Sequence, residues 1–110
     1  MILAVIGSRG LVVDDLSKYI PEGVTEIVSG GARGIDLCAR AYANAHGIKL
    51  TEFLPDYAKY GRSAPIRRNV QIIEYADEIC AIWDGRSKGT AFVIKECERR
   101  GKPVKIHRAD

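Results

Sequence analysis

Five short apolar runs alternate along this chain with stretches whose apolar residues have helical spacing, and this alternation restricts the fold more than any other feature. We expect five strands, at Ile2–Gly7, Thr25–Ser29, Lys49–Leu54, Glu78–Trp83 and Val104–His107. Strands that alternate with helices pair in parallel, because parallel neighbours need a crossover connection. The sequence therefore predicts an α/β fold, a Rossmann-like three-layer α/β/α sandwich with a five-stranded parallel sheet in the order 3-2-1-4-5.

Four helices are expected between these strands. The first ends before Pro21, the second spans about residues 34–46, the third about 65–76, and the fourth runs from Gly89 to a stop at Gly101. Each helix should bury one apolar face. The expected buried residues are Val13, Leu16, Tyr19 and Ile20 in the first helix, Ile35, Cys38, Ala41, Tyr42 and Ala45 in the second, Ile66, Val70 and Ile73 in the third, and Ala91, Ile94 and Cys97 in the fourth. The long connection from 55 to 64 is a candidate binding loop, in which Tyr57 and Tyr60 could stack on a base.

The length of 110 residues, with 46% hydrophobic and 28% charged residues, is that of one soluble globular domain spanning residues 1–110. A net charge of +3 is too small for the electrostatic footprint of a protein that binds duplex nucleic acid. The apolar run from Ile2 to Ile6 is too short for a signal peptide or a membrane span, so we expect a cytoplasmic protein with no membrane partner. The cysteines and histidines lie far apart, and this spacing speaks against a metal site.

Three glycine-containing turns lie at the ends of strands or at the starts of helices: Gly7-Ser8-Arg9, Ser29-Gly30-Gly31 with Arg33 close behind, and Ser87-Lys88-Gly89-Thr90. The carboxyl ends of parallel strands meet at one edge of a sheet, so these turns should converge there. Glycine leaves backbone N–H groups open to a ligand, and a helix N-terminus attracts phosphate. Arginine, serine and threonine side chains add donors, although Thr90 on its own favours the role of a helix cap, which can coexist with ligand binding. We therefore predict a phosphate-sized anion site.

Polar residues in the second half of the chain can extend this site. Arg67, Arg68 and Asn69 begin the third helix, and the two arginines must face differently, because helical neighbours are about 100° apart. A buried Asn69 would need a partner in the backbone or in a ligand. Asp84 either forms an Asp-Gly turn or holds a ribose hydroxyl or a hydrated Mg²⁺, while Asp36 suits the N-terminus of its helix. We expect no required cofactor, although Mg²⁺ can accompany a nucleotide.

Two standard nucleotide-binding fingerprints are missing. No G-x-G-x-x-G follows the first strand and no acidic residue ends the second, which argues against a dinucleotide-binding Rossmann domain. No G-x-x-x-x-G-K-[ST] occurs, which argues against a P-loop NTPase. A nucleotide site in this chain must therefore be built differently.

A family resemblance is carried by Gly7-Ser8-Arg9, the segment from Ser29 to Asp36, Arg68-Asn69, Ala76-Asp77, Trp83-Asp84-Gly85 and Ser87-x-Gly89-Thr90. In order and spacing these motifs resemble the SLOG superfamily, and most closely its small, single-domain, YspA-like branch. The resemblance covers the chain from Ile2 to Val104. It implies a Rossmann-like fold and a nucleotide or nucleotide-derived ligand at the glycine-rich strand ends. Relatives include the Lonely Guy phosphoribohydrolases, which release a base from a nucleoside monophosphate, and the DNA-processing family, which binds single-stranded DNA.

One departure from these relatives bears on catalysis. The Lonely Guy enzymes, and the nucleoside deoxyribosyltransferases that the segment 76–90 also resembles, place a catalytic glutamate three residues after the threonine of their Gly-Thr turn. This chain has Val93 at that position, and Glu96, one helical turn further on, should point away. The DNA-processing family typically has a histidine after its Gly-Ile-Asp segment, where this chain has Arg40 nearby. The residues needed for base release are thus incomplete.

The leading hypothesis is a small protein of the sensor type that binds a nucleotide or nucleotide derivative, and Val93 speaks against an enzyme. One alternative is an N-glycosidic or phosphoribosyl hydrolase of nucleoside monophosphates, with Arg67 or Arg68 on the phosphate and Asp36 or Asp84 as the carboxylate. Another alternative is a binder of single-stranded nucleic acid, against which stand the small net charge and the lack of a continuous basic and aromatic groove.

A homodimer or higher homo-oligomer is expected. Ile72, Phe92 and Val93 lie outside the expected buried faces of the third and fourth helices, and so small a domain cannot cover all of them. The resemblance points the same way, because relatives in the superfamily pair through equivalent helices.

Overall fold

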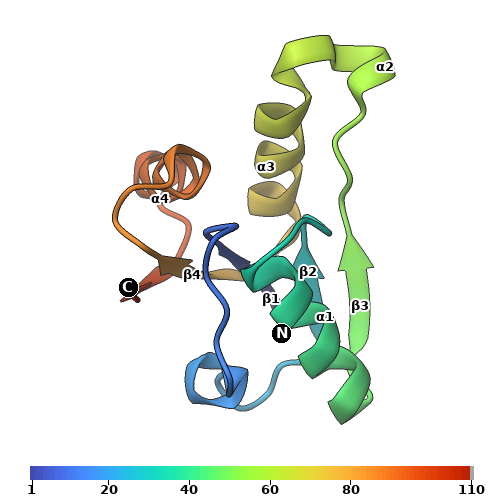
Figure 1. Cartoon of the computed structure of the whole chain (residues 1–110), viewed down its shortest axis with the longest axis vertical. Coiled ribbons are helices and arrows are strands. Elements are labelled where there is room, and N and C mark those ends of the chain that lie inside the picture. Colours follow the sequence, from blue (N-terminus) through green and yellow to red (C-terminus); the bar gives the residue numbers. More distant parts are fainter. Residues whose placement is uncertain (110) are drawn as a thin grey trace.

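The computed structural model describes residues 1–109 as a parallel sheet with helices on both faces (Figure 1). The strands are β1 Ile2–Gly7, β2 Glu26–Ser29, β3 Lys49–Glu52, β4 Glu78–Trp83 and β5 Val104–Arg108. All neighbours pair in parallel in the order β3-β2-β1-β4-β5. The predicted fold class and strand order are therefore confirmed.

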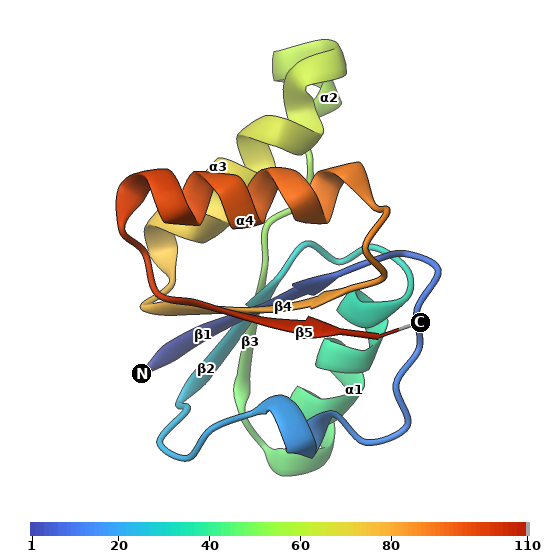
Figure 2. The ribbon, with the colours of Figure 1, turned by 90° about the vertical axis from the view of Figure 1, so that its left-hand side faces the viewer.

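Six helical segments connect the strands: η1 Leu16–Tyr19, α1 Ile35–His46, α2 Tyr57–Tyr60, η2 Gly61–Ser63, α3 Ala64–Tyr75 and α4 Lys88–Arg100. In Figure 2, α3 and α4 cover one face of the sheet, and α1 and η1 cover the other. The residues between β3 and α3 are not one open loop, because α2 and η2 wind much of this stretch into helical turns. No helix in the described part of the chain combines the length and apolar composition that crossing a bilayer requires.

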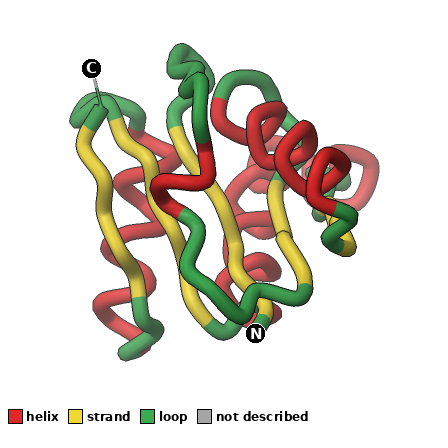
Figure 3. The backbone as a smooth tube through the Cα atoms, turned by 90° about the horizontal axis from the view of Figure 1, so that it is seen from below, coloured by secondary structure: helices red, strands yellow, loops and turns green. Residues whose placement is uncertain are grey.

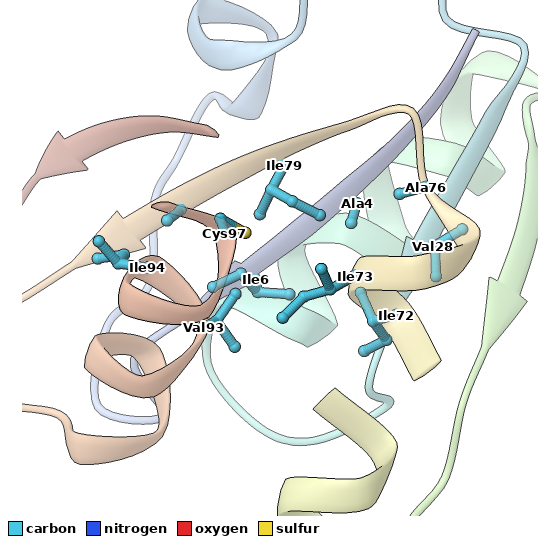
Figure 4. Close-up of a cluster of buried hydrophobic side chains, with 11 residues drawn as sticks. Ala4, Ile6, Val28, Ile72, Ile73, Ala76, Ile79, Val93, Ile94 and Cys97 are labelled. Carbon is cyan, nitrogen blue, oxygen red and sulfur yellow. The ribbon is translucent and has the colours of Figure 1, made fainter. Parts of the chain in front are cut away.

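Two apolar clusters hold the layers together. The cluster in Figure 4 lies between the sheet and α3 and α4, and includes Ala4, Ile6, Ile73, Ile79 and Val93. The cluster on the opposite face joins the sheet to α1 and η1. The central strands β1 and β4 contribute to both clusters, which explains why their sequences are continuously apolar rather than alternating.

The first predicted helix is wrong, because the structure forms only the four-residue 3₁₀ helix η1 there. The Asp15 carboxylate accepts a hydrogen bond from the Ser17 N–H at 3.1 Å, so the turn begins only at Leu16. The turn ends at Ile20, whose backbone is extended, as the residue before Pro21 prefers. Figure 3 shows this short helix lying across the strands within an otherwise irregular connection.

Some expected helix faces also need correction. Ala41 and Ala45 of α1 are exposed, and Ala39 and Ala43 are buried instead. Ile66 of α3 is 50% exposed. The buried residues of α3 are Ala64, Arg68, Ile72 and Ile73, and those of α4 are Thr90, Val93, Ile94 and Cys97. Ile72 and Val93 are therefore core residues, and the argument that they require a partner chain is wrong.

Candidate functional site

A cavity of about 420 Å³ lies at the carboxyl edge of the sheet. It is formed by the turn after β1, the turn between β2 and α1, the first half of α3, and the start of α4. Of the predicted ligand-binding residues and the predicted carboxylates, those that line it are Gly7, Ser8, Arg9, Gly30, Asp36, Arg68, Asn69, Asp84, Ser87, Gly89 and Thr90. The structure thus brings the three glycine turns to one place.

Four predicted residues do not line this cavity. The buried Ser29 hydroxyl accepts a hydrogen bond from the Gly31 N–H at 3.2 Å and so serves its own turn. Gly31 has a φ of +70°, and Leu54 and Glu52 pack against it. Arg33 and Arg67 are exposed outside the cavity.

Six lining residues were not predicted, namely Ile6, Gly10, Ala32, Pro65, Ile72 and Val93. Gly10 and Ala32 adjoin predicted residues in the sequence, so the motif spacing was a usable signal for them, whereas Pro65 lies two positions before Arg67. Ile6, Ile72 and Val93 belong to the apolar core and form the floor of the cavity. An apolar residue of this kind carries no sequence signal that separates a cavity wall from the core.

Glycine is required where the turns are pressed together. A Cβ on Gly7 would lie 2.4 Å from the Ile82 carbonyl oxygen and 2.5 Å from Ile35 Cγ1. Gly34 has a φ of +70°, and its Cβ position would lie 2.6 Å from the Ser8 carbonyl oxygen. These contacts place the start of α1 directly against the turn after β1.

Asp84 forms a turn, as one of its two predicted roles requires. Its Oδ1 accepts hydrogen bonds from the backbone N–H groups of Arg86 and Ser87, both at 2.8 Å, and these bonds lower the pKa of its carboxyl. The Asp84 N–H in turn donates to the buried Ser8 hydroxyl at 3.1 Å. The turns after β1 and β4 are thereby joined. Among residues 1–109, no cluster of side chains suits a metal ion.

Arg68 is a buried cation in the wall of the cavity. Its Nη1 donates to the Gly30 carbonyl at 2.8 Å and to the Phe53 carbonyl at 3.3 Å. Its Nε donates to Asn69 Oδ1 at 3.0 Å, which leaves the amide N–H groups of Asn69 for the cavity. Burial lowers the pKa of Arg68, although Asp36 opposes that change. Asn69 is partly buried, and its partner is the Arg68 side chain rather than the backbone or a ligand that the sequence led us to expect.

Asp36 is the innermost acidic group of the site and is 7% exposed. Its Oδ2 accepts a hydrogen bond from the Ala32 N–H at 3.1 Å. Burial raises the pKa of its carboxyl, and this hydrogen bond and the charges of Arg68 and Arg9 partly oppose the rise. The carboxyl and both guanidinium groups therefore share one electrostatic environment, in which the two cations favour an anion.

The first turn of α4 carries hydroxyl groups, but Thr90 does not cap the helix. Ser87 precedes the first helical residue, and Thr90 lies third within the helix with its Oγ1 3.3 Å from Ser87 Oγ. Glu96 pairs with Arg99 and Arg100 and does not line the cavity, as predicted. The position that holds a glutamate in related hydrolases is occupied here by Val93, which does line it.

The tyrosines of the β3–α3 connection lie outside the lining residues. Tyr57 is 58% exposed on α2. The Tyr60 ring contacts the Arg67 guanidinium, whose Cζ lies 5.2 Å from the ring centroid, and the Lys59 amine lies 5.1 Å from it. The expected stacking of either ring on a base stays a prediction.

Comparison with protein families gives one finding that agrees with this geometry. The model of the YspA, cpYpsA-related SLOG family matches residues 3–60, which is more than half of the chain. The matched segment includes the first two glycine turns of the cavity. The comparisons with curated proteins and with solved structures give no match. This chain belongs to the YspA, cpYpsA-related SLOG family.

Proposed function

We propose that this protein binds a nucleotide or a nucleotide derivative as a sensor, with a phosphate group of the ligand in the cavity. The observation that carries the proposal is the convergence of three glycine turns on a cavity that also holds two guanidinium groups, those of Arg9 and Arg68. Family membership is consistent with a nucleotide-related role. The cavity volume, about 420 Å³, lies in the range of small-molecule sites.

The donors of the cavity suit phosphate oxygens. Ser8 and Thr90 are buried with their hydroxyl groups at the site, and Gly89, whose Cβ position has nothing within 4 Å, leaves the backbone there open. Arg9 is exposed and supplies a guanidinium that can pair with two phosphate oxygens. We therefore expect phosphate to bind between the turn after β1 and the start of α4.

The hydrolase alternative depends on Asp36. Val93 cannot stabilise an oxocarbenium-like state, and the Asp84 carboxylate already accepts hydrogen bonds from two backbone N–H groups. Asp36 is buried in the cavity wall and has a raised pKa, which is a property of many general acids. We expect binding without efficient release of the base.

A thermal-shift panel tests the proposal. Nucleoside mono-, di- and triphosphates, ADP-ribose and NAD are each added with and without Mg²⁺, because a ligand that binds the native state raises its unfolding temperature. At least one compound should raise the midpoint, and the variant R9A should reduce that rise. No shift with any phosphate compound would contradict the proposal.

Chromatography of nucleoside monophosphates incubated with the protein tests turnover separately. Only the intact nucleotide should be recovered. Rapid release of free base that is lost in D36N would instead establish the hydrolase.

A further inference from the structure

We propose that Asp36 accepts a hydrogen bond from a sugar hydroxyl group of the bound ligand, so that the cavity selects a phosphorylated pentose over a phosphate group alone. This inference rests on the proposed phosphate site. It adds the chemical class of the group next to the phosphate and assigns its recognition to one residue.

The first observation is an acceptor that has no partner within the protein. Asp36 is 93% buried and lines the cavity, and its Oδ2 accepts the Ala32 N–H. Within residues 1–109, its Oδ1 has no hydrogen-bond partner. Oδ1 is not one of the fully buried atoms that lack a partner in residues 1–109, so it is open to the cavity, where an O–H group of a ligand can donate to it.

The second observation is that several donors line the cavity together with Asp36. Arg9, Arg68, Asn69 and the hydroxyl groups of the site all offer N–H or O–H donors to the cavity. A bare phosphate satisfies donors only, and it would place its own negative charge close to the Asp36 carboxylate. A phosphorylated pentose satisfies both groups, because its phosphate accepts from the donors and its hydroxyl donates to Asp36.

The third observation is the position of Asp36 beside the cations. The position that a Cβ on Gly30 would occupy is 2.4 Å from Arg68 Nη1 and 3.1 Å from Asp36 Oδ2. The guanidinium and the carboxyl therefore lie close together on the same side of Gly30. In a nucleotide, the sugar is the unit joined directly to the phosphate. A carboxylate beside this cation is therefore positioned to accept a hydrogen bond from a sugar hydroxyl when the phosphate binds in the cavity.

Calorimetry with ribose 5-phosphate and methyl phosphate tests the inference. Methyl phosphate is a phosphate ester without a sugar hydroxyl group, so the ratio of the two affinities measures what the sugar contributes to binding. We expect ribose 5-phosphate to bind the wild-type protein about 10-fold more tightly or better, the effect of a hydrogen bond to a charged group. The ratio should fall to about 2-fold or less in D36N, whose amide oxygen can still accept the Ala32 N–H.

The variant E52Q is the matched control. Glu52 also raises the pKa of Asp36, but it pairs with Arg40 at 2.9 Å and does not line the cavity. E52Q therefore removes a nearby negative charge without touching the ligand, and it should keep the affinity ratio of the wild type. Thermal unfolding of each variant confirms that it is folded.

Three results would overturn the inference. Equal affinity of the wild-type protein for both esters would reject the role of Asp36 while leaving the phosphate site standing, and this comparison needs no variant. An unchanged ratio in folded D36N would assign the sugar to another group. No binding of either ester at millimolar concentration would reject the phosphate site as well.

Discussion

At the scale of single residues, the two arginines of the cavity have different tasks. Arg68 is buried, and its guanidinium is held by the carbonyl groups of Gly30 and Phe53 and by the Asn69 amide. Arg9 lies on an exposed turn at the rim. Arg68 is therefore a fixed cation in the wall of the cavity, and we expect Arg9 to be the group that moves onto a ligand.

Replacement of Arg9 by alanine should weaken binding of the best ligand in the panel by about 1.5–3 kcal/mol, because a charge-assisted hydrogen bond is lost. Calorimetry measures the change. R86A is the control, since Arg86 is exposed in the turn before α4 but does not line the cavity. Equal affinities of R9A and the wild-type protein would remove Arg9 from the site.

The variant D36N should unfold at a higher temperature than the wild-type protein at pH 7. Burial raises the pKa of Asp36, so the native state holds this proton more tightly than the unfolded chain does. The stability that the protonated carboxyl permits is complete below about pH 4 and is lost as the pH rises through the native pKa. The two proteins should therefore have similar midpoints near pH 3 and differ increasingly above it.

Thermal unfolding between pH 3 and pH 8 measures this difference. A lower midpoint of D36N at pH 7, with the wild-type midpoint rising from pH 3 to pH 7 relative to the variant, would show that the ionised carboxylate stabilises the fold.

Chemical identity made many of the site residues predictable, but it did not reveal their orientation. Ser8, Arg9 and Asn69 have side chains that suit a ligand, and all three line the cavity. Ser29 has an equally suitable hydroxyl group, yet that group already accepts a hydrogen bond from the Gly31 N–H. Val93 was predictable as a departure from related enzymes but not as a wall of the cavity. A side chain's direction depends on tertiary packing, which a single sequence does not show.

At the scale of elements, the site depends on how closely α1 approaches the end of β1. Gly7 makes this approach possible, because the Ile35 side chain of α1 and the Ile82 carbonyl of β4 fill the space where a Cβ would be. The first residues of α1 can then adjoin the cavity. A larger residue must push the helix or the neighbouring strand away.

The variant G7A should lose about 1–3 kcal/mol of unfolding free energy, the usual cost of overpacking a filled core. Urea denaturation followed by circular dichroism measures the loss. G10A is the matched control, because nothing lies within 4 Å of its Cβ position in the next turn of the same connection. Similar stability of G7A and G10A would mean that the packing around Gly7 relaxes freely.

The strands were predictable because buried β-branched runs are a strong signal, whereas the helical faces were harder to assign. In α3 the buried stripe runs through Ala64, Arg68 and Ile72, so a charged residue interrupts it and the pattern favours Ile66 and Val70 instead. Arg68 is buried because the carbonyl groups of Gly30 and Phe53 satisfy it. A buried charged residue of this kind hides the periodicity of its own helix.

At the scale of the whole molecule, the strand order explains where the cavity lies. From β1 the chain builds outward through β2 to β3, and it then returns to place β4 and β5 on the other side of β1. The connections after β1 and β4 therefore lead to opposite faces and leave a crevice between them. The cavity lies at this switch point, lined by the turns after both strands.

The chain should form a homodimer through the segment that projects beyond the sheet. Leu54, Tyr57 and Ile66 are 64%, 58% and 50% exposed, and they lie in the segment that includes α2 and the start of α3 (Figures 1 and 2). Exposed apolar side chains that are grouped in this way are typical of association surfaces. Light scattering at micromolar concentration should give twice the mass of one chain.

The variant I66K should shift the mass toward that of a monomer, because a lysine charge is costly to bury in an interface. I106K adds the same charge on β5, where Ile106 is 47% exposed, and should remain dimeric. A monomeric mass of the wild-type protein, or equal effects of the two substitutions, would contradict association through this segment.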